Sequence, residues 1–467
     1  MIKDPIIKKF TYPNKEDIKK EDLLHFIEKH QTERIPIYEE NLSFITQTNI
    51  KIDKTFQKEE ENNKFSGIRH RNNICNLILK THLNYLMGDG ISYTDKGSEE
   101  DDESLEKFLE IRKNKDFKTK EYKTVEEMGK MGTSYSLIYL NEDNEIQWSI
   151  LEPKQTFVIY SSELEGEPIW GVRYYTDFFD NEIIELWGKS FYRKYKKIED
   201  EEEYIIEEEK ENIFNIMPVV EFRNDEYGFS DFQPIKPHID DINKTITTQS
   251  NLIHYINDAI LILKNIGVDE EEVEKMFQNK IVSFNTGEPN IDIGMDFLKK
   301  PIDTDSIKQH LNILIKGAFR DSFTPLMTSE EISKAPSGKS LQSMYLTADL
   351  VASQKEARIR EGMKRVIRII FKMLNFRRLT DVYNNNNIEP KFSRNLPTIT
   401  ISEIEDLLQV NNVQKLSTKT NLELLPNKYV SDAEEEMERI QEQTKKNITY
   451  DFIEEEEEEE KSDKDET

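Results

Sequence analysis

The chain has 467 residues, enough for several domains, and its 36% hydrophobic and 10% aromatic residues are enough to build real cores. Its formal net charge of −28, from 92 acidic and 64 basic residues, argues against static gripping of nucleic acid but not against DNA sliding past. The single cysteine, Cys75, excludes an internal disulfide and a cysteine-based zinc site.

We also expect neither a signal segment nor a membrane span. The polar start has no apolar stretch behind it, and no run of about 18 apolar residues occurs. The sequence therefore predicts a protein that is made in a reducing, cytoplasm-like compartment and has no membrane partner.

The first part of the chain is expected to be mainly helical. Residues 1–60 are polar and helix-prone, and their apolar pattern is concentrated at 23–27. Three further helices are predicted over 71–88, 99–112 and 125–131, and glycines at 88 and 132 end the first and the third.

From 133 to 223 the residue pattern changes to short runs of aromatic and β-branched residues separated by turn residues, which predicts an antiparallel meander. The stretch 199–211 is expected to be an acidic loop or a charged strand edge. The predicted strands cover 135–140, 146–151, 156–161, 169–175, 183–188, 191–198 and 218–222.

From about 231 the apolar period becomes helical. Positions from Ile239 to Leu263 that step alternately by three and four residues are apolar except for Gln249, which predicts a helix with a heptad seam that ends at Gly267. A small mixed segment should follow over 268–301, with a helix near 270–277 and strands near 280–285 and 297–301.

A second amphipathic helix is predicted from Asp303 or Thr304 to near Pro325, since both first residues are good N-caps. Its apolar positions step by four, three and four from Ile307 to Ala318. A loop at 325–339 then precedes the longest helix, 340–379, and a polar turn, a strand at 398–401 and short helices complete the ordered part. The tail 451–467 holds eleven acidic and two basic residues and is expected to be disordered.

Two amphipathic helices that flank a small insert typically complete their burial against other helices. The sequence leaves two interpretations open with equal weight: an assembly module shared among subunits, or an ordinary bundle inside a monomeric enzyme. The residues that would lie at a subunit interface are Ile246, Ile253, Ile260, Leu311 and Leu314.

Motifs for catalysis are weak. The turn Gly338-Lys339-Ser340 resembles a phosphate-binding loop only in part, because Ser333 stands where glycine is needed and Pro336 removes an amide. The seven histidines show no metal-ligand spacing, so we expect no catalytic residue, no cofactor and no metal.

The stretch from Lys339 to Arg378 carries ten basic and three acidic residues, against the trend of the whole chain. A stripe at every fourth position, 360 to 372, could contact phosphate or an acidic protein surface. We favour ion pairs with acidic protein surface, because the chain supplies so many carboxylates.

Four stretches occur in the order seen in one known family. They are 71–91, ending in Gly88-Asp89-Gly90-Ile91; Pro218–Phe222 with Ser230-Asp231 and Asp240–Asn243; Ser337–Leu341 before the long helix; and Leu416–Thr420 with Leu425-Pro426 and 432–440. Together they resemble the portal proteins of tailed bacteriophages, in particular the SPP-type portal family. Two residues depart from the family pattern: Gly90 stands in the region where the family usually has a proline, and Ser340 stands where it usually has an alanine.

The resemblance implies an α+β portal fold and a homo-oligomeric ring, a dodecamer, around a channel for double-stranded DNA. It implies a mixed wing (1–230), a stem of two helices (231–266 and 303–324), a clip (267–302), a tunnel loop (325–339), a long helix (340–380), a crown (381–450) and an acidic tail (451–467). Tunnel-loop candidates are Thr328, Ser329, Glu330, Glu331 and Ser333, and channel candidates are Lys244, Lys264, Lys308, Lys316, Arg320 and Lys334.

The same resemblance implies partners and a location. The partners would be the terminase large subunit, the major capsid and scaffolding proteins and a head–tail adaptor. The protein would pass through the host cytoplasm during assembly and end at the portal vertex of the virion. The alternatives are an enzyme that acts on nucleotides or phosphates, using the turn at Lys339, and a non-catalytic scaffold protein.

Overall fold

The structure is a computed structural model whose chain divides into two compact units. Unit 1 comprises residues 1–46, 75–234 and 319–467, and unit 2 comprises residues 47–74 and 235–318. The residues that the structure describes are 6–13, 16–48, 70–95, 102–164, 166–198, 203–257, 260–264, 294–298, 304–326, 344–378, 388–394, 436–437 and 439–440.

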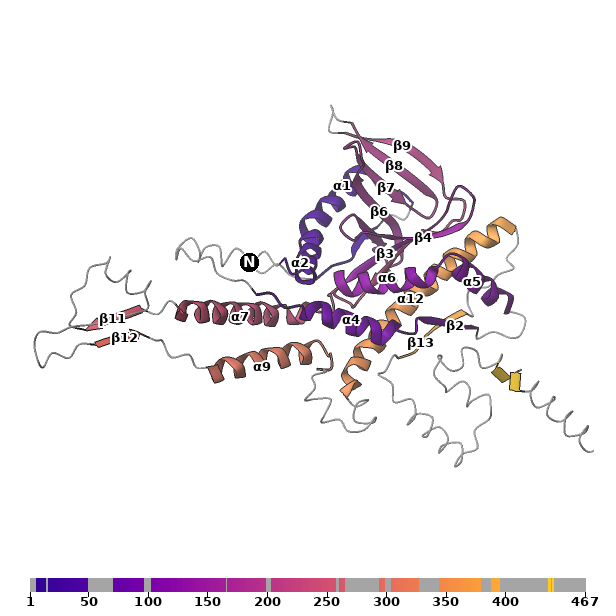
Figure 1. Ribbon diagram of the computed structural model, residues 1–467. Coiled ribbons are helices and arrows are strands. Elements are labelled where there is room, and N and C mark those ends of the chain that lie inside the picture. Colours follow the sequence, from indigo (N-terminus) through magenta and orange to yellow (C-terminus); the bar gives the residue numbers. More distant parts are fainter. Residues whose placement is uncertain are drawn as a thin grey trace, which may run out of the picture. The chain divides into compact units, whose positions relative to one another are not determined.

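Unit 1 contains a six-stranded sheet in the order β1-β5-β6-β7-β8-β9 (Figure 1). Strands β5 to β9 form an antiparallel meander, and β1 adds to β5 in parallel. The strands are β1 (Phe10–Tyr12), β5 (Thr156–Ser161), β6 (Pro168–Thr176), β7 (Glu182–Trp187), β8 (Phe191–Lys197) and β9 (Tyr204–Glu211).

Apolar side chains of this sheet form a core with the N-terminal helix α1 (Lys20–Lys29). Leu23, Phe26 and Ile27 of α1 are buried with Phe157 and Trp170 of the sheet. After α1 a short π-helical turn, His30–Arg34, leads into α2 (Ile35–Ile45). The helical prediction is confirmed over 20–45, and residues 49–60 lie outside the described part of the chain. Strand β1 was not foreseen because three residues carry too little periodicity to mark a strand.

A second, three-stranded sheet has the order β10-β3-β4 and is antiparallel throughout. Its residues share the largest hydrophobic core with the surrounding helices, including Phe222 of β10, Ile138 of β3 and Trp148 of β4. The elements are β3 (Thr133–Leu140), β4 (Ile146–Leu151), β10 (Val219–Arg223), α4 (Ile74–Met87), α5 (Asp102–Asn114), α6 (Phe117–Met131) and α12 (Leu346–Arg378).

The predicted strands 135–140, 146–151 and 156–161 are confirmed almost to the residue, but the prediction of one continuous meander is wrong. The chain switches sheets between β4 and β5, and β10 returns to pair with β3. This pairing joins segments about eighty residues apart, so local periodicity does not reveal it. The acidic stretch is a strand edge, since β9 is the outer strand of the larger sheet.

A two-stranded ribbon joins distant parts of unit 1. Strand β13 (Ile388–Phe392) pairs antiparallel with β2 (Ile91–Asp95), and α12 packs on both β10 and β13. Neither strand was predicted. The predicted strand at 398–401, the turn at 384–387 and most of 381–450 lie outside the described residues.

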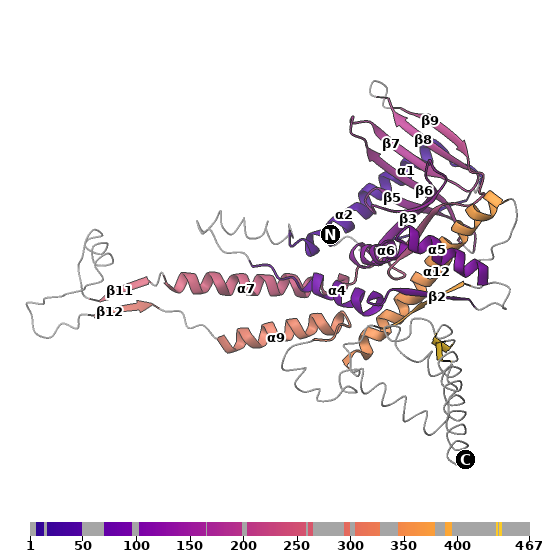
Figure 2. The same cartoon turned by 45° about the vertical axis from the view of Figure 1, so that its right-hand side comes forward.

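Unit 2 contains α7 (Lys236–Asn257), the hairpin strands β11 (Ile260–Lys264) and β12 (Gly294–Leu298), and α9 (Thr304–Asp321), whose last residues belong to unit 1 (Figures 1 and 2). The second predicted helix is confirmed as α9. The helix predicted through Leu263 ends instead at Asn257.

The error concerns the end of the heptad pattern. Residues 260–264 read Ile-Leu-Ile-Leu-Lys and form β11, which pairs antiparallel with β12. A short apolar run fits a buried strand as well as a helix, and strand pairing decided the outcome. Ile260, expected on the helical seam, therefore lies on a strand. The predicted strand near 297–301 is found at 294–298, and the helix at 270–277 lies outside the described residues.

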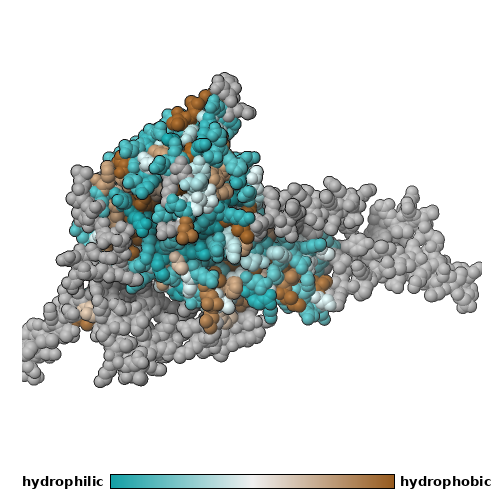
Figure 3. Space-filling view, turned by 180° about the vertical axis from the view of Figure 1, so that it is seen from behind, coloured by the Kyte–Doolittle hydropathy of each residue, from teal (hydrophilic) through white to brown (hydrophobic). Residues whose placement is uncertain are grey.

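The face of the molecule drawn in Figure 3 is mainly hydrophilic, with separate hydrophobic patches. Within the described residues, the helices are too short or too polar for any of them to cross a bilayer.

Candidate functional site

Helices α7 and α9 of unit 2 lie antiparallel and come close where α7 begins and α9 ends. A Cβ added to Gly317 of α9 would lie 2.9 Å from Nε2 of His238 on α7, so a larger residue would push the helices apart. Asp241 of α7 and His310 of α9 approach within 3.5 Å. Both of these side chains are about half exposed, so this pair alone contributes little to stability.

Two polar residues of α7 hold the extended segment that precedes α4. The backbone amide of Asn72 donates to Oδ1 of Asn243 at 2.9 Å, and the amide of His70 donates to Oγ1 of Thr247 at 3.0 Å. Asn243 and Thr247 are buried and stand four residues apart, so they share one face of the helix. This face of α7 is therefore occupied within the subunit.

The apolar faces of the two helices are only partly covered. On α7, Ile239 and Ile242 are buried and Ile246 is half-buried. On α9, Leu311 and Leu314 are half-buried, whereas Ile313 is 62% exposed. A single chain thus leaves part of the apolar surface of this hairpin in water.

Exposed cations accompany these apolar positions. Lys244, Lys308 and Lys316 are exposed, and Arg320 is exposed but pairs with the neighbouring Asp321 at 2.8 Å. Lys264 lies on strand β11 rather than on a helix. Ile253 lies on α7 as expected, and Lys334 and the tunnel-loop candidates lie outside the described residues.

A buried polar junction lies in unit 1, around Asp231. Asp231 stands shortly before the chain leaves unit 1 for α7, and its carboxylate is almost fully buried. Lys355 of α12 donates to its Oδ1 at 2.5 Å, and Asn224, next to β10, donates to the same oxygen at 2.7 Å. His82 of α4 lies 3.6 Å from Oδ2.

The junction also reaches the segment that follows α9. The hydroxyl of Thr324 lies 2.9 Å from Nε2 of His82, and it is buried together with Ser322. Asp231 and Thr324 stand near the two points where the chain leaves and re-enters unit 1. Contacts among buried groups thus tie both of these points to α4 and α12.

Close packing and charge explain why this arrangement is held. The backbone amide of Asp231 donates to the carbonyl of Gly129 at 2.9 Å, and a Cβ at Gly129 would lie 2.7 Å from the carboxylate. Burial raises the pKa of Asp231, but Lys355 and His82 lower it by more, and the net pKa lies well below its usual range. Asp231 is therefore ionised in the folded protein.

This junction was not predicted from the sequence, although a signal was present. Lys355 lies between Ala352 and Ile359, which are buried on the same stripe of α12, and a lysine at such a position needs a buried partner. His82 likewise lies among the buried residues of α4. The partner Asp231 is remote in sequence, so only the fold identifies it.

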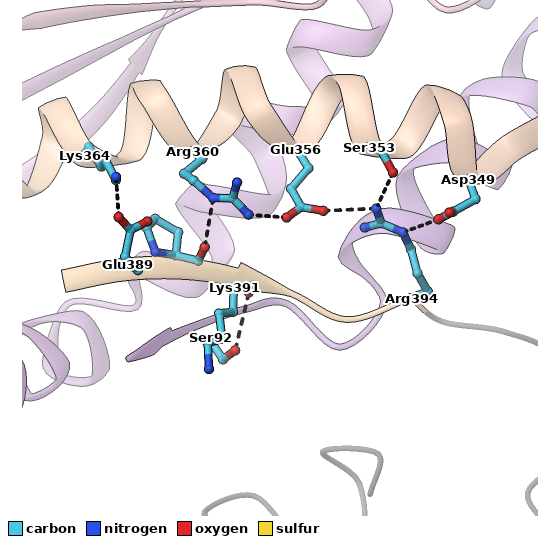
Figure 4. A network of polar contacts seen from close by, with 10 residues as sticks. Ser92, Asp349, Ser353, Glu356, Arg360, Lys364, Glu389, Lys391 and Arg394 are labelled. Atoms are coloured by element: carbon cyan, nitrogen blue, oxygen red, sulfur yellow. Dashed lines mark hydrogen bonds and ion pairs between the residues drawn. The ribbon is translucent and has the colours of Figure 1, made fainter. Parts of the chain in front are cut away.

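A second network joins α12 to the segment that contains β13 (Figure 4). Arg394 donates to Asp349 at 2.7 Å and to Glu356 at 3.0 Å, both on α12. Glu356 also pairs with Arg360, and Lys364 pairs with Glu389 of β13. Arg360 donates further to the carbonyl of Pro390 at 3.3 Å.

These contacts divide the predicted basic stripe. Its first two members, Arg360 and Lys364, pair with carboxylates of the protein, as favoured from the sequence. Arg368 and Lys372 are exposed, and no ion pair joins either of them to another residue of the described part. Within the described part of the chain, the C-terminal half of the stripe is thus exposed and differs from the paired N-terminal half.

A metal site is not found among the residues that the structure describes. Within them, no three His, Cys, Asp or Glu side chains are placed to hold a metal ion. The turn at Gly338-Lys339-Ser340 lies outside those residues.

Comparison with known proteins gives a consistent result. Residues 24–450 match the family described as phage portal protein, SPP1 Gp6-like, and the chain belongs to this family. The portal protein of Bacillus phage SPP1 is 21% identical over 398 residues, which cover 82% of this chain and 76% of that protein.

Two further comparisons found similarity, one to another phage portal protein and one to a solved structure. The portal protein of Clostridium phage phiCD119 is 24% identical over 306 residues, which cover 62% of this chain and 64% of that protein. Among solved structures, the neck of a native gene transfer agent particle, computed with C12 symmetry, is similar with a TM-score of 0.41 and 12% identity. That similarity covers 75% of this chain and 88% of the other.

Proposed function

We propose that this chain is the subunit of a homo-oligomeric portal ring, a dodecamer, that conducts double-stranded DNA at one vertex of a phage capsid. Membership of the portal family over residues 24–450 is the observation that carries the proposal. It favours a structural protein over an enzyme that acts on nucleotides or a generic scaffold.

The exposed apolar surface supports shared burial between copies. Ile313 of α9 is 62% exposed, and Leu346 and Leu350, one turn apart on α12, are 64% and 61% exposed. Burying a side chain of this size gains about 1.5–3 kcal/mol, so repeated contacts around a ring would contribute substantially. We assign Ile246, Ile253, Leu311 and Leu314 to the same interface.

Helices α7 and α9 would form the stem, and the β11–β12 hairpin with its neighbouring residues would form the clip. Residues 325–339 would be the tunnel loop, α12 the long helix, and 381–450 the crown. The two sheets with α1, α2, α4, α5 and α6 would form the wing. Exposed Lys244, Lys308 and Lys316 are candidates for weak contact with DNA in the channel.

The charge balance suits a conduit. A protein that forms many phosphate contacts holds DNA tightly, and each contact must be broken again during movement. A net charge of −28 per chain, with isolated lysines on the stem, avoids such holding. The terminase large subunit, the capsid and scaffolding proteins and a head–tail adaptor would dock on the outside of the ring, first in the host cytoplasm and then in the virion.

Negative-stain microscopy of the purified protein tests the proposal. We expect homogeneous rings with a central hole, and a monomer at micromolar concentration would contradict it. ATP binding that is lost in Lys339→Ala would instead support the enzyme alternative.

A further inference from the structure

An amphipathic cleft of about 310 Å³ lies in unit 1 between α12 and the segment before β10. Its apolar lining includes Met217, Val219, Val220 and Ile369, all of which are at most 8% exposed. A volume of this size is at the small end of ligand sites, so the cleft has room for a few side chains only.

Cations line the same cleft. Arg365 and Arg368 of α12 and Lys189 from the β7–β8 turn contribute to it, against a single carboxylate, Glu167. Arg365 pairs with Glu361 at 2.8 Å, whereas Arg368 and Lys189 are exposed and form no ion pair with any residue in the described ranges. The cleft thus combines an apolar floor with two exposed cations, Arg368 and Lys189, that form no ion pair among the described residues.

One segment of this chain matches both properties. Residues 450–460 read Tyr-Asp-Phe-Ile followed by seven glutamates, so three apolar side chains within four residues precede a dense acidic run. The segment holds eight acidic and no basic residues. We propose that residues 450–460 of the same chain dock in this cleft, with the apolar side chains of 450–453 on the floor and the glutamates along Arg368 and Lys189.

The physical reason for docking has two parts. Removing aromatic and aliphatic surface from water supplies the affinity, and the two exposed cations supply charge complementarity. A run of glutamates alone would be attracted to any basic surface and would be screened within about 8 Å at physiological salt. The apolar floor makes the attraction specific. This inference does not depend on ring formation.

Mobility of the tail in the full-length chain tests the proposal. A spin label on Ser462→Cys reports it by electron paramagnetic resonance, and Cys75 does not compete for the label because it is buried. We expect a slowed label in the otherwise unchanged chain and a mobile one in Arg368→Glu. Replacing Phe452 by Ser should also release it, because the apolar contact is lost.

Lys372→Glu is the matched control, since Lys372 is exposed, lies one turn further along α12 and does not belong to the cleft lining. This variant should leave the label slow. Free peptide 450–460 should release the label, and affinity for that peptide should fall about tenfold or more in Arg368→Glu. A slowing that depends on protein concentration would indicate docking on a neighbouring copy, and one that does not would indicate docking within the chain.

Three outcomes would overturn the proposal. The first is equal label mobility in the unchanged chain and in Arg368→Glu. The second is equal release by Lys372→Glu, which would mean general attraction to a basic helix. The third is a mobile tail combined with binding of short duplex DNA that is lost in Arg368→Glu, which would assign the cleft to nucleic acid.

Discussion

Removing one partner from the buried pair of Asp231 and Lys355 should destabilise unit 1 strongly. The side chains are 2% and 8% exposed, and the joined atoms are 2.5 Å apart. Asp231→Asn leaves the lysine charge buried without a counter-charge, and Lys355→Met leaves the carboxylate with only His82 and Asn224. Breaking a buried ion pair in this way costs about 3–5 kcal/mol.

Urea unfolding followed by circular dichroism measures this cost. With an m-value of about 1–3 kcal/mol per M, a cost of about 3–5 kcal/mol should lower the unfolding midpoint by roughly 1–5 M in each variant. All samples need the same protein concentration, because any assembly of copies stabilises the folded state. Lys364→Met is the matched control: it is the same substitution on the same helix, but its pair with Glu389 is 42% exposed on the lysine side and is worth about 0–1 kcal/mol.

The double variant Asp231→Asn with Lys355→Met separates pairing from packing. Its cost should fall short of the summed single costs by about 1–3 kcal/mol, because neither charge is then left alone. The reasoning would be refuted if both single variants cost no more than Lys364→Met, or if the two costs were simply additive.

Four further outcomes are expected. The pKa of Asp231 in the folded protein lies below its unfolded value of about 3.9, so the ion pair with Lys355 contributes its full stability above about pH 4. The difference in unfolding midpoint between the unchanged protein and Asp231→Asn should shrink as the pH falls further. A constant difference down to the acid transition would contradict this. Burial, and after it the charge of Arg34, holds the pKa of His30 well below its usual value. Near pH 6.5 the unfolded chain therefore binds a proton that the folded chain does not bind, and stability falls as the pH decreases further. The variant His30→Gln should reduce this loss of stability below about pH 6.5, as measured by thermal melts across that range. Ile313→Asp should prevent ring formation, as measured by size-exclusion chromatography, because it would bury a charge at the interface. Asn312→Asp adds the same charge at the exposed neighbouring position and should leave the rings intact. Intact rings from Ile313→Asp would mean that this side chain faces solvent in the ring. Deleting 451–467 should leave assembly unchanged in micrographs, because a polyglutamate run contributes no core, and lost rings would contradict this.

The basic stripe of α12 shows what charge spacing can predict and what it cannot. Spacing predicted a row of cations from Arg360 to Lys372, and it correctly favoured ion pairs with protein carboxylates for the first two members. It did not reveal that Arg368 borders an apolar cleft. That neighbourhood is formed by β10 and the β7–β8 turn, which lie far from α12 in sequence.

Local pattern and tertiary pairing thus contributed different things. Apolar helical spacing over 74–87 and 304–321 predicted α4 and α9, and the long helix α12 was predicted as well. Short aromatic and β-branched runs between turn residues predicted most strands of the sheets, because these signals lie within one element. The order of motifs identified the family. Sequence alone therefore determined the main elements, the acidic balance and the class of protein.

Contacts between distant segments decided the rest. Residues 260–264 became strand β11 because 294–298 pairs with them, β10 returned to β3 rather than continuing the meander, and Asp231 met Lys355 across more than a hundred residues. Strand pairing and burial of charge depend on which partner the fold supplies, and that partner is not encoded in the neighbouring residues.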